Sequence, residues 1–281
     1  MKNEIQKVWK WLFGIIVVLI FCLPVVFLLA GSLKGTKELT DSLGAVIAGK
    51  GGDLQWNFFP AYPTLRHYVK VLLDSPQFWT LFWNSVKLTS VTVLGQILIS
   101  IPAAWGFARY RFTHAIFRIY MILMMIPFQV RMISEYLLLQ RMDLLDSFWG
   151  IVLPAVFSAY PVFIMFQFFV SIPEEVLDAA RIDGATEWQL FVRIGVPLGK
   201  TGIISSLMLS VLECWNMIEQ PMVFLDTKSL WPVALYVPQI TENGIGISFT
   251  VSILVLILPF LVFLAGQEYI QKGIAAFMKG E

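Results

Sequence analysis

The stretch EEVLDAARIDGATEWQLFVRIGVPLGKT, from Glu174 to Thr201, separates two of the most apolar regions of a 281-residue chain. It is rich in charged residues, alanine and glycine, whereas 58% of the chain is hydrophobic and only 14% is charged. That composition, with a mean hydropathy of +0.75, is outside the range of soluble domains. We therefore expect a membrane protein in which this stretch is a polar connection between spans.

Six apolar runs are long enough to cross a bilayer, which takes about 20 residues as a helix. They cover residues 11–33, 78–107, 115–139, 148–169, 202–223 and 247–265. Prolines inside the runs predict kinked helices, since each removes a backbone donor: Pro24, Pro127, Pro154, Pro161 and Pro259. The sequence thus predicts an all-α membrane protein with six transmembrane helices.

The distribution of Lys and Arg predicts the orientation of these helices. With the N-terminus inside, the two short outer loops hold only Arg141 and Lys228. The basic residues placed on the cytoplasmic side are Lys2, Lys7, Lys10, Arg109, Arg111, Arg118, Arg181, Arg193, Lys200, Lys272 and Lys279. Both termini are therefore expected in the cytoplasm. The long outer segment 34–77 carries five more basic residues, but loops of that length are read less strictly.

The first apolar run is predicted to be a retained membrane helix rather than a signal peptide. It extends over about 23 residues, whereas the apolar region of a signal peptide has about 7 to 15. The segment 34–77 that follows is rich in Gly, Pro and aromatic residues, and its part GKGGDLQWNFFPAYPTLRHY (49–68) is typical of a loop with a short helix.

Several kinds of site are excluded by spacing. GVPLGKT resembles a phosphate-binding loop, but Gly195 and Gly199 enclose three residues where that loop needs four, and Pro197 has no amide to donate. His67 and His114 are expected on opposite sides of the membrane, and both cysteines, Cys22 and Cys214, fall inside spans, so we expect no metal site, no cofactor and no Cys–His nucleophile. A net charge of +1 gives no indication of nucleic acid.

An intramembrane enzyme is the rival class. Its best pair of carboxylates is Glu213 with Glu219, but on one continuous helix these residues point about 120° apart. That separation is poor for a paired general acid and base.

The polar connection is predicted to form two short helices at a glycine elbow. Pro173 and the acidic residues Glu174 and Glu175 favour a helix start, and Asp183-Gly184 ends that helix. A second helix follows over 185–194 until Pro197 interrupts it before the fifth span. The result is either a rigid cytoplasmic knob that docks into another protein or a surface connector without a partner.

These residues resemble the inner-membrane permease subunits of ABC importers, whose cytoplasmic loop reads E-A-A, three residues, G, and then I-x-L-P. The matching positions here are Asp178, Ala179, Ala180, Gly184, Ile194, Val196 and Pro197, with Asp in place of Glu. The resemblance implies a coupling helix that sits in a cleft of a separate ATP-hydrolysing subunit, so this chain is itself not an enzyme. The implied contact residues are Glu175, Asp178, Ala179, Ala180, Asp183, Gly184 and Pro197.

The resemblance runs from about Trp79 to Lys279, and within the family this part of the chain is most similar to the maltose-type, carbohydrate branch. It is carried by NSVKLT (84–89), AAWGFARYRF (103–112), IPEEVLDAARIDGA (172–185) and CWNMIEQP (214–221). It implies the type I ABC importer permease fold in a bacterial cytoplasmic membrane. It also implies a sugar or oligosaccharide as cargo, with a second permease, two ATP-binding subunits and an extracytoplasmic solute-binding protein as partners.

The resemblance also implies a division of the chain. Residues 1–77 are expected to form an N-terminal helix with the external segment. Residues 78–267 are expected to form a five-helix permease core with the coupling loop at 171–200, and 268–281 a cytoplasmic tail.

Polar side chains at membrane depth indicate a solute path, because such residues are costly there unless they face a cavity or a partner. On the fifth span, residues at spacings of 4, 3, 3 and 4 share one helical face: Ser206, Ser210, Glu213, Asn216 and Gln220. Trp215 adds a flat apolar face that suits a sugar. The predicted path consists of Glu213, Trp215, Asn216, Gln220, Lys87 and Arg131.

Two alternatives stay open for this stripe. Small and amide residues also mark helix interfaces in bilayers, and Arg131 with Glu135 is spaced as a self-contained i, i+4 ion pair. The cargo has an alternative too, since a cation at Arg131 would suit glycerol phosphate or its diesters.

Overall fold

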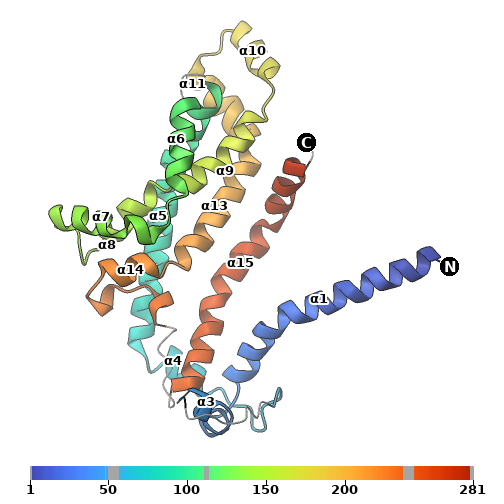
Figure 1. Ribbon diagram of the computed structural model, residues 1–281, viewed down its shortest axis with the longest axis vertical. Coiled ribbons are helices and arrows are strands. Elements are labelled where there is room, and N and C mark those ends of the chain that lie inside the picture. Colours follow the sequence, from blue (N-terminus) through green and yellow to red (C-terminus); the bar gives the residue numbers. More distant parts are fainter. Residues whose placement is uncertain (1, 48, 50–56, 111–113, 237–243, 279–281) are drawn as a thin grey trace. The chain divides into compact units, whose positions relative to one another are not determined.

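A computed structural model describes residues 2–47, 49, 57–110, 114–236 and 244–278. All regular structure in these residues is helical (Figure 1). The expected loop at 50–56 and the end of the tail, 279–281, lie outside the described residues.

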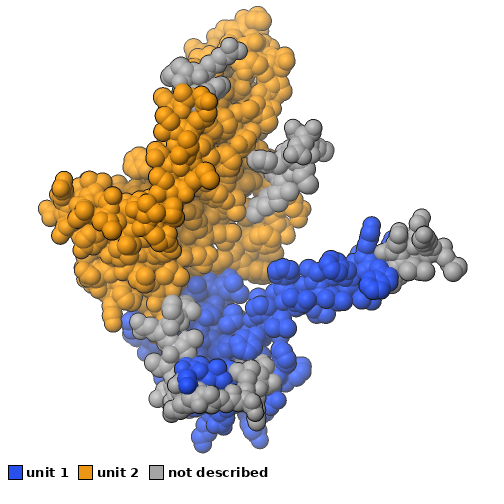
Figure 2. Space-filling view, in the orientation of Figure 1, with its two compact units in different colours: residues 1–79, 237–257 blue, residues 80–236, 258–281 orange. Residues whose placement is uncertain are grey.

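The chain forms two compact units, coloured separately in Figure 2. The first contains residues 1–79 and 237–257, and the second contains residues 80–236 and 258–281. Two long helices, α5 (Pro76–Arg109) and α15 (Ile245–Met278), contribute to both units.

The first unit is built where α1 (Lys2–Ser32) ends and α15 begins. Its other elements are α2 (Thr36–Leu39), the π-helical turn η1 (Thr40–Gly44), α3 (Ala45–Ile47) and α4 (Arg66–Leu72). Leu39 and Leu43 pack with Ile245, and Phe27 meets Phe249 edge to face at 5.4 Å. The short helices that follow α1 thus cover the beginning of α15.

The second unit is a helical bundle followed by loops. Its elements after α5 are α6 (His114–Met124), α7 (Phe128–Arg141), α8 (Phe148–Val156), α9 (Ala159–Val170), α10 (Glu174–Ile182), α11 (Glu187–Gln189), the π-helical turn η3 (Leu190–Gly195), α12 (Val196–Leu198), α13 (Lys200–Trp215), α14 (Glu219–Phe224), and the 3₁₀ turns η4 (Lys228–Leu230) and η5 (Val233–Leu235). Helices α9 and α13 form its most extensive helix contact. Their close approach uses Gly202, whose missing side chain leaves room for Phe168.

Among the described residues, four helical segments are long and apolar enough to cross a membrane: Trp9–Ser32, Pro76–Arg109, Phe148–Val170 and Ile245–Tyr269. Two further pairs reach this length only if each pair is one broken span. The first pair, Ala115–Met124 with Phe128–Arg141, bends by 98°, and the second, Glu187–Leu198 with Lys200–Trp215, bends by 70°. The chain therefore has four to six candidate spans.

The third predicted span is broken rather than kinked. Pro127 is the N-cap of α7, with an extended backbone that starts a new helix at Phe128. Because proline has no amide and restricts the residue before it, the backbone leaves the helical conformation here.

The fifth predicted span, 202–223, was expected to be one helix, and this is wrong. Helix α13 ends at Trp215 with Asn216 as its C-cap, and α14 begins only at Glu219. Pro221 explains the break, because in a continuous helix its ring would clash with the carbonyl of residue 217. In α14 it lies in the first turn, where a missing amide costs nothing.

Candidate functional site

The end of α10 depends on the conformation of Gly184, whose φ is +85°. The amides of Gly184 and Ala185 donate to the carbonyls of Arg181 and Ala180, both at 3.0 Å, which closes the helix end. A Cβ at Gly184 would meet nothing within 4 Å. The position therefore requires glycine for its backbone conformation and not for lack of space, and the predicted glycine elbow is confirmed.

The second helix of the elbow begins with a capping box. Thr186 Oγ1 accepts from the Gln189 amide at 3.3 Å, and the Thr186 amide donates to Gln189 Oε1 at 2.8 Å. The chain then continues through η3 and α12, with Pro197 in the first turn of α12, into α13. The segment 174–198 is called the coupling knob below, after the role that the sequence resemblance implies.

One guanidinium ties the two helices of the coupling knob together. Arg181 lies 3.2 Å from Glu174, 2.8 Å from Asp178 and 3.1 Å from Glu187. These hydrogen bonds, first that to Glu187 and then that to Asp178, raise the pKa of Arg181. Single exposed ion pairs contribute little, but a network around one planar guanidinium fixes geometry.

The coupling knob is rooted in the bundle by buried apolar side chains. Leu177 from α10 and Leu190 from η3 are fully buried in a core with Trp105 of α5. The Trp105 ring meets Phe169 at 5.4 Å and Phe191 at 5.8 Å. The knob therefore packs directly on α5 and α9.

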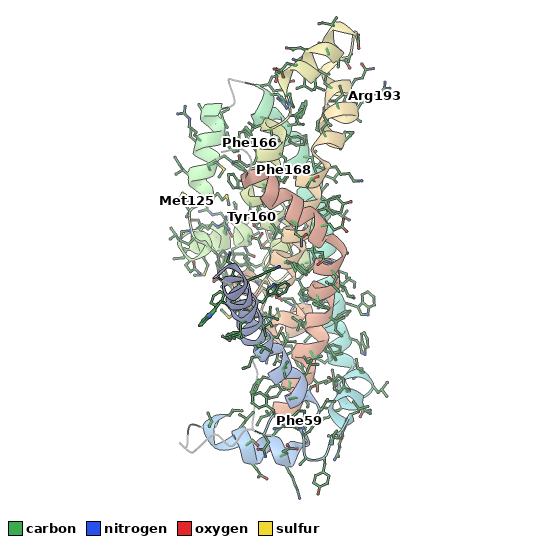
Figure 3. The ribbon with its side chains drawn as sticks, turned by 90° about the vertical axis from the view of Figure 1, so that its right-hand side faces the viewer. Phe59, Met125, Tyr160, Phe166, Phe168 and Arg193 are labelled. Carbon is green, nitrogen blue, oxygen red and sulfur yellow. The ribbon has the colours of Figure 1, made fainter. Side chains whose placement is uncertain are left out.

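The outer surface of the coupling knob carries the residues predicted from the sequence. Most of them are exposed, and only Ala180 is half-buried: Glu175, Asp178, Ala179, Asp183, Gly184 and Pro197. Sequence reasoning missed two apolar side chains at the same elbow, Ile182 and Trp188, which are 86% and 69% exposed. An isoleucine and a tryptophan inside an otherwise polar connection were the available signal. Arg193 lies in the same segment (Figure 3).

The bundle also contains two polar cavities. The first has a volume of about 470 Å³ and is lined by Tyr120, Leu123, Met124, Arg131, Phe157, Ser158, Ala159, Tyr160, Leu209 and Glu213. Tyr160 lies near the start of α9 and Phe166 further along the same helix (Figure 3). Phe166 stacks on Phe117 of α6 with ring centroids 3.9 Å apart, which holds α6 against α9.

The second cavity has a volume of about 460 Å³ and lies at the break between α13 and α14. It is lined by Gln96, Phe128, Arg131, Glu135, Pro154, Ala155, Ser158, Glu213, Cys214, Asn216, Met217, Ile218, Glu219 and Gln220. Arg131, Ser158 and Glu213 line both cavities, so the two adjoin at these side chains.

Four of the six predicted path residues line a cavity: Arg131, Glu213, Asn216 and Gln220. Trp215 does not line either one, because it is only 1% exposed and meets Phe82 edge to face at 5.8 Å. Lys87 is exposed on α5 and also lies outside both lining sets.

The predicted polar stripe on the fifth span divides in two. Ser206 is fully buried and donates to the Pro161 carbonyl of α9 at 3.3 Å, and Ser210 is buried on the same side. This half packs α13 against α9. The C-terminal half, from Glu213 to Gln220, faces the second cavity, although α13 ends at Trp215 within this half.

The break also changes the argument about paired carboxylates. Glu213 and Glu219 were placed on different faces of a continuous helix, yet both line the second cavity. Gln129 of α7 donates to Glu219 Oε1 at 2.8 Å, and Arg131 Nε lies 3.2 Å from Glu135 Oε1. The predicted i, i+4 ion pair on α7 is thus present and forms part of a cavity wall.

Known proteins are similar to this chain in sequence. Residues 96–276 match the family described as Binding-protein-dependent transport system inner membrane component. The arabinooligosaccharides transport system permease protein AraQ of Bacillus subtilis is 28% identical over 276 residues, covering 96% of this chain and 95% of that protein. The sn-glycerol-3-phosphate transport system permease protein UgpE of Escherichia coli is 28% identical over 208 residues, covering 72% and 74%.

A solved structure shows the same fold. It is a bacterial ABC transporter involved in the import of the acidic polysaccharide alginate, and one of its chains is 22% identical. The TM-score is 0.77, and the match covers 96% of this chain and 98% of that one. Since the family match spans well over half of the sequence, the chain belongs to the binding-protein-dependent transport system inner membrane components, the permease subunits of ABC importers.

Proposed function

We propose that this permease subunit forms part of the translocation path for a sugar or oligosaccharide that an external binding protein delivers. The observation that carries the proposal is the direct succession of η3, α12 and α13, with a 70° bend and only Gly199 between the last two. This segment begins in the coupling knob and ends at Trp215, beside the second cavity. A movement imposed on the knob would therefore change the cavity wall at Glu213 and Asn216.

The knob supports a role in coupling to a separate ATP-hydrolysing chain. Ile182 and Trp188 present apolar surface beside Glu175, Asp178 and the other exposed charges, a combination that suits a cleft in a partner protein. In this proposal the elbow docks there, and ATP is hydrolysed on that partner. The complete importer would contain a second permease, two ATP-binding subunits and the extracytoplasmic binding protein.

The proposed topology has six spans and both termini in the cytoplasm of a bacterial cell. It treats each bent helix pair as one broken span and rests on the excess of Lys and Arg on the cytoplasmic side. The proposed organisation keeps residues 1–77 as N-terminal helix and external segment, 78–267 as permease core and 268–281 as tail. In this arrangement the knob lies in the cytoplasm, where the ATP-binding subunits are.

The proposed solute path uses the residues that line the cavities: Arg131, Glu213, Asn216 and Gln220. Trp215 is left out because its ring is packed against Phe82. Lys87, exposed on α5, would reach the path only where a second permease closes it. A sugar as cargo is supported by AraQ, whose name assigns it to arabinooligosaccharide transport.

Two measurements on separate preparations test the function. ATP hydrolysis is assayed for the purified chain alone and for the co-purified complex; we expect it only in the complex. A panel of sugars and phosphorylated glycerols is then screened by thermal shift against the cognate binding protein, and a sugar is expected to give the largest shift. Catalytic activity of the isolated chain would support the enzyme class instead.

A further inference from the structure

The wall of the second cavity contains buried hydrogen-bond acceptors that have no partner. Gln96 of α5 is 2% exposed, and its Nε2 donates to the Ala155 carbonyl at 2.9 Å, which leaves its Oε1 without a donor. Glu135 is similar, since its Oε1 meets Arg131 at 3.2 Å while its buried Oε2 has no hydrogen-bond partner. Both side chains line the cavity. An unsatisfied buried acceptor is unfavourable, so we expect water or a solute in the cavity to donate to these atoms.

The charged groups of the cavities are mainly negative. Among the described lining residues, one cation faces three carboxylates: Arg131 against Glu135, Glu213 and Glu219. The guanidinium of Arg131 is already held by Glu135 on its own helix. The walls that this chain provides therefore carry a net negative charge.

We infer that the cavities take an uncharged, hydroxyl-rich solute and disfavour phosphate or carboxylate groups. This inference rests on the proposed function and specifies its substrate class. A sugar hydroxyl donates as well as accepts and can satisfy Gln96 Oε1 and Glu135 Oε2. An ionised phosphate presents mainly acceptors, so it would leave both atoms unsatisfied. It would also bring a further negative charge close to Glu213 and Glu219.

The three carboxylates and the two unpartnered acceptors thereby favour a sugar over a phosphorylated cargo. The position of Arg131 alone could not decide between them. Arg131 was the reason to consider glycerol phosphate, but its charge is balanced within α7. The chain is similar to UgpE, a glycerol-3-phosphate permease by name, and to an importer of acidic alginate. The carboxylate-rich wall predicts that its own cargo differs in charge from both.

The electrostatic potential can be measured directly with charged thiol reagents. Ser158 lines both cavities and makes no cap hydrogen bond, so Ser158→Cys places one reactive thiol there. The other cysteines are removed by Cys22→Ser and Cys214→Ala. In the co-purified importer in nanodiscs, labelling rates are compared for cationic and anionic methanethiosulfonates, each normalised to its rate with a free small thiol.

We expect the cationic reagent to be favoured by at least about tenfold, which corresponds to roughly 1.4 kcal/mol of differential interaction. Adding Glu213→Gln should lower the ratio, and adding Arg131→Gln should raise it. A ratio near one, or a preference for the anion, would overturn the inference. So would failure of Ser158→Cys and of a second variant, Ala159→Cys, to react with a small neutral reagent, since the cavities would then be closed to solutes.

Uptake separates this inference from the proposed function. Proteoliposomes that contain the importer are given maltotriose or trigalacturonate. The two trisaccharides have similar length, but maltotriose is uncharged and trigalacturonate carries carboxylates. Uptake of maltotriose at least about tenfold faster than that of trigalacturonate supports the inference. Faster uptake of trigalacturonate would reject the charge argument while leaving the transport role intact. If the labelling experiment shows a preference for the cation but the complex transports neither sugar, the result would instead count against the proposed cargo path.

Discussion

Arg109 and Glu174 connect the end of α5 to the beginning of α10, with Nη1 of Arg109 2.9 Å from Oε2 of Glu174. The same guanidinium donates through Nη2 to the carbonyls of Phe169, in the last turn of α9, and of Ile172, just after that helix, at 2.5 and 3.2 Å. It also lies over the Trp105 ring at 5.0 Å. One side chain thus adds a charged donor at the C-terminal end of α9 and holds the coupling knob on the bundle.

Replacing Arg109 should loosen the knob. In Arg109→Gln the Phe169 and Ile172 carbonyls lose a charged donor, and we expect a loss of about 2 kcal/mol of stability. The thermal unfolding midpoint of the purified complex and the rate of ATP-driven uptake should both decrease. Glu174→Gln is the matched control, because Glu174 is largely exposed and its loss should change stability by less than about 1 kcal/mol. Equal effects of the two changes would contradict the capping role.

The glycine elbow gives a second prediction. Gly184→Val places a β-branched residue at φ +85° and should cost about 1 kcal/mol or more in backbone strain. The variant should assemble poorly with the ATP-binding subunits. Gly184→Asn tests the cause, since Asn tolerates positive φ and the position has free space, so it should retain most of the assembly. Full solute-stimulated ATP hydrolysis and uptake by Gly184→Val would argue against the coupling assignment.

The cavity residues of α13 should affect transport and not assembly. Glu213 and Asn216 are exposed and line the second cavity, so Glu213→Leu or Asn216→Leu should remove hydrogen bonds to the solute. Uptake is expected to decrease at least about tenfold, because a loss of roughly 1.4 kcal/mol corresponds to that factor. Size-exclusion chromatography should still show the intact complex with measurable basal ATP hydrolysis. Dissociation in detergent would show that these residues hold the subunits together instead.

The ion pair on α7 predicts rescue in a double variant. Arg131→Gln alone leaves Glu135 without its partner and should lower thermal stability and uptake. Adding Glu135→Gln removes the unpaired charge, so both properties should recover, and the two effects should be strongly non-additive. A double variant that is stable but does not transport would assign Arg131 to the cargo and favour a phosphorylated one.

Asp146 gives a prediction about pH. It accepts hydrogen bonds from the Thr227 hydroxyl, the Thr227 amide and the Asp226 amide, and these lower its pKa, with the Thr227 hydroxyl as the largest cause. The stabilisation is therefore present above the unfolded pKa of about 3.9 and is lost as the pH falls through the folded value. Asp146→Ala should lower the unfolding midpoint at pH 7, and the difference from wild type should shrink below about pH 4.

The control for this experiment is Asp146→Asn. It keeps an acceptor and tolerates the φ of +52° at this position, so its midpoint should lie between those of wild type and Asp146→Ala at pH 7. A difference between wild type and Asp146→Ala that stays constant from pH 7 to pH 3 would show that the carboxylate charge is not what connects the two loops.

The apolar runs and the glycine elbow were predictable because they depend on local properties. A bilayer requires long apolar helices, and Asp183-Gly184 permits the positive φ that ends α10. The path through α13 was harder to predict. A helical face can be calculated only for a continuous helix. Pro221 forces a break, and the spacing of polar residues does not predict the direction that the chain takes after it.

The roles of buried polar residues also depended on tertiary structure. Trp215 and Gln96 both carry polar groups within predicted spans, but one packs against Phe82 and the other turns an open acceptor toward a cavity. Nothing in the local sequence distinguishes these two outcomes. Arg109 was predicted only as a cytoplasmic charge, because its carbonyl partners lie about 60 positions further along the chain.

The most direct test of the account is uptake of a radiolabelled oligosaccharide by proteoliposomes that contain the co-purified importer. We expect uptake that requires ATP on the cytoplasmic side and the cognate binding protein on the other, and that is abolished when this chain is omitted. Accumulation of the sugar without ATP or without the binding protein, or undiminished accumulation without this chain, would contradict it.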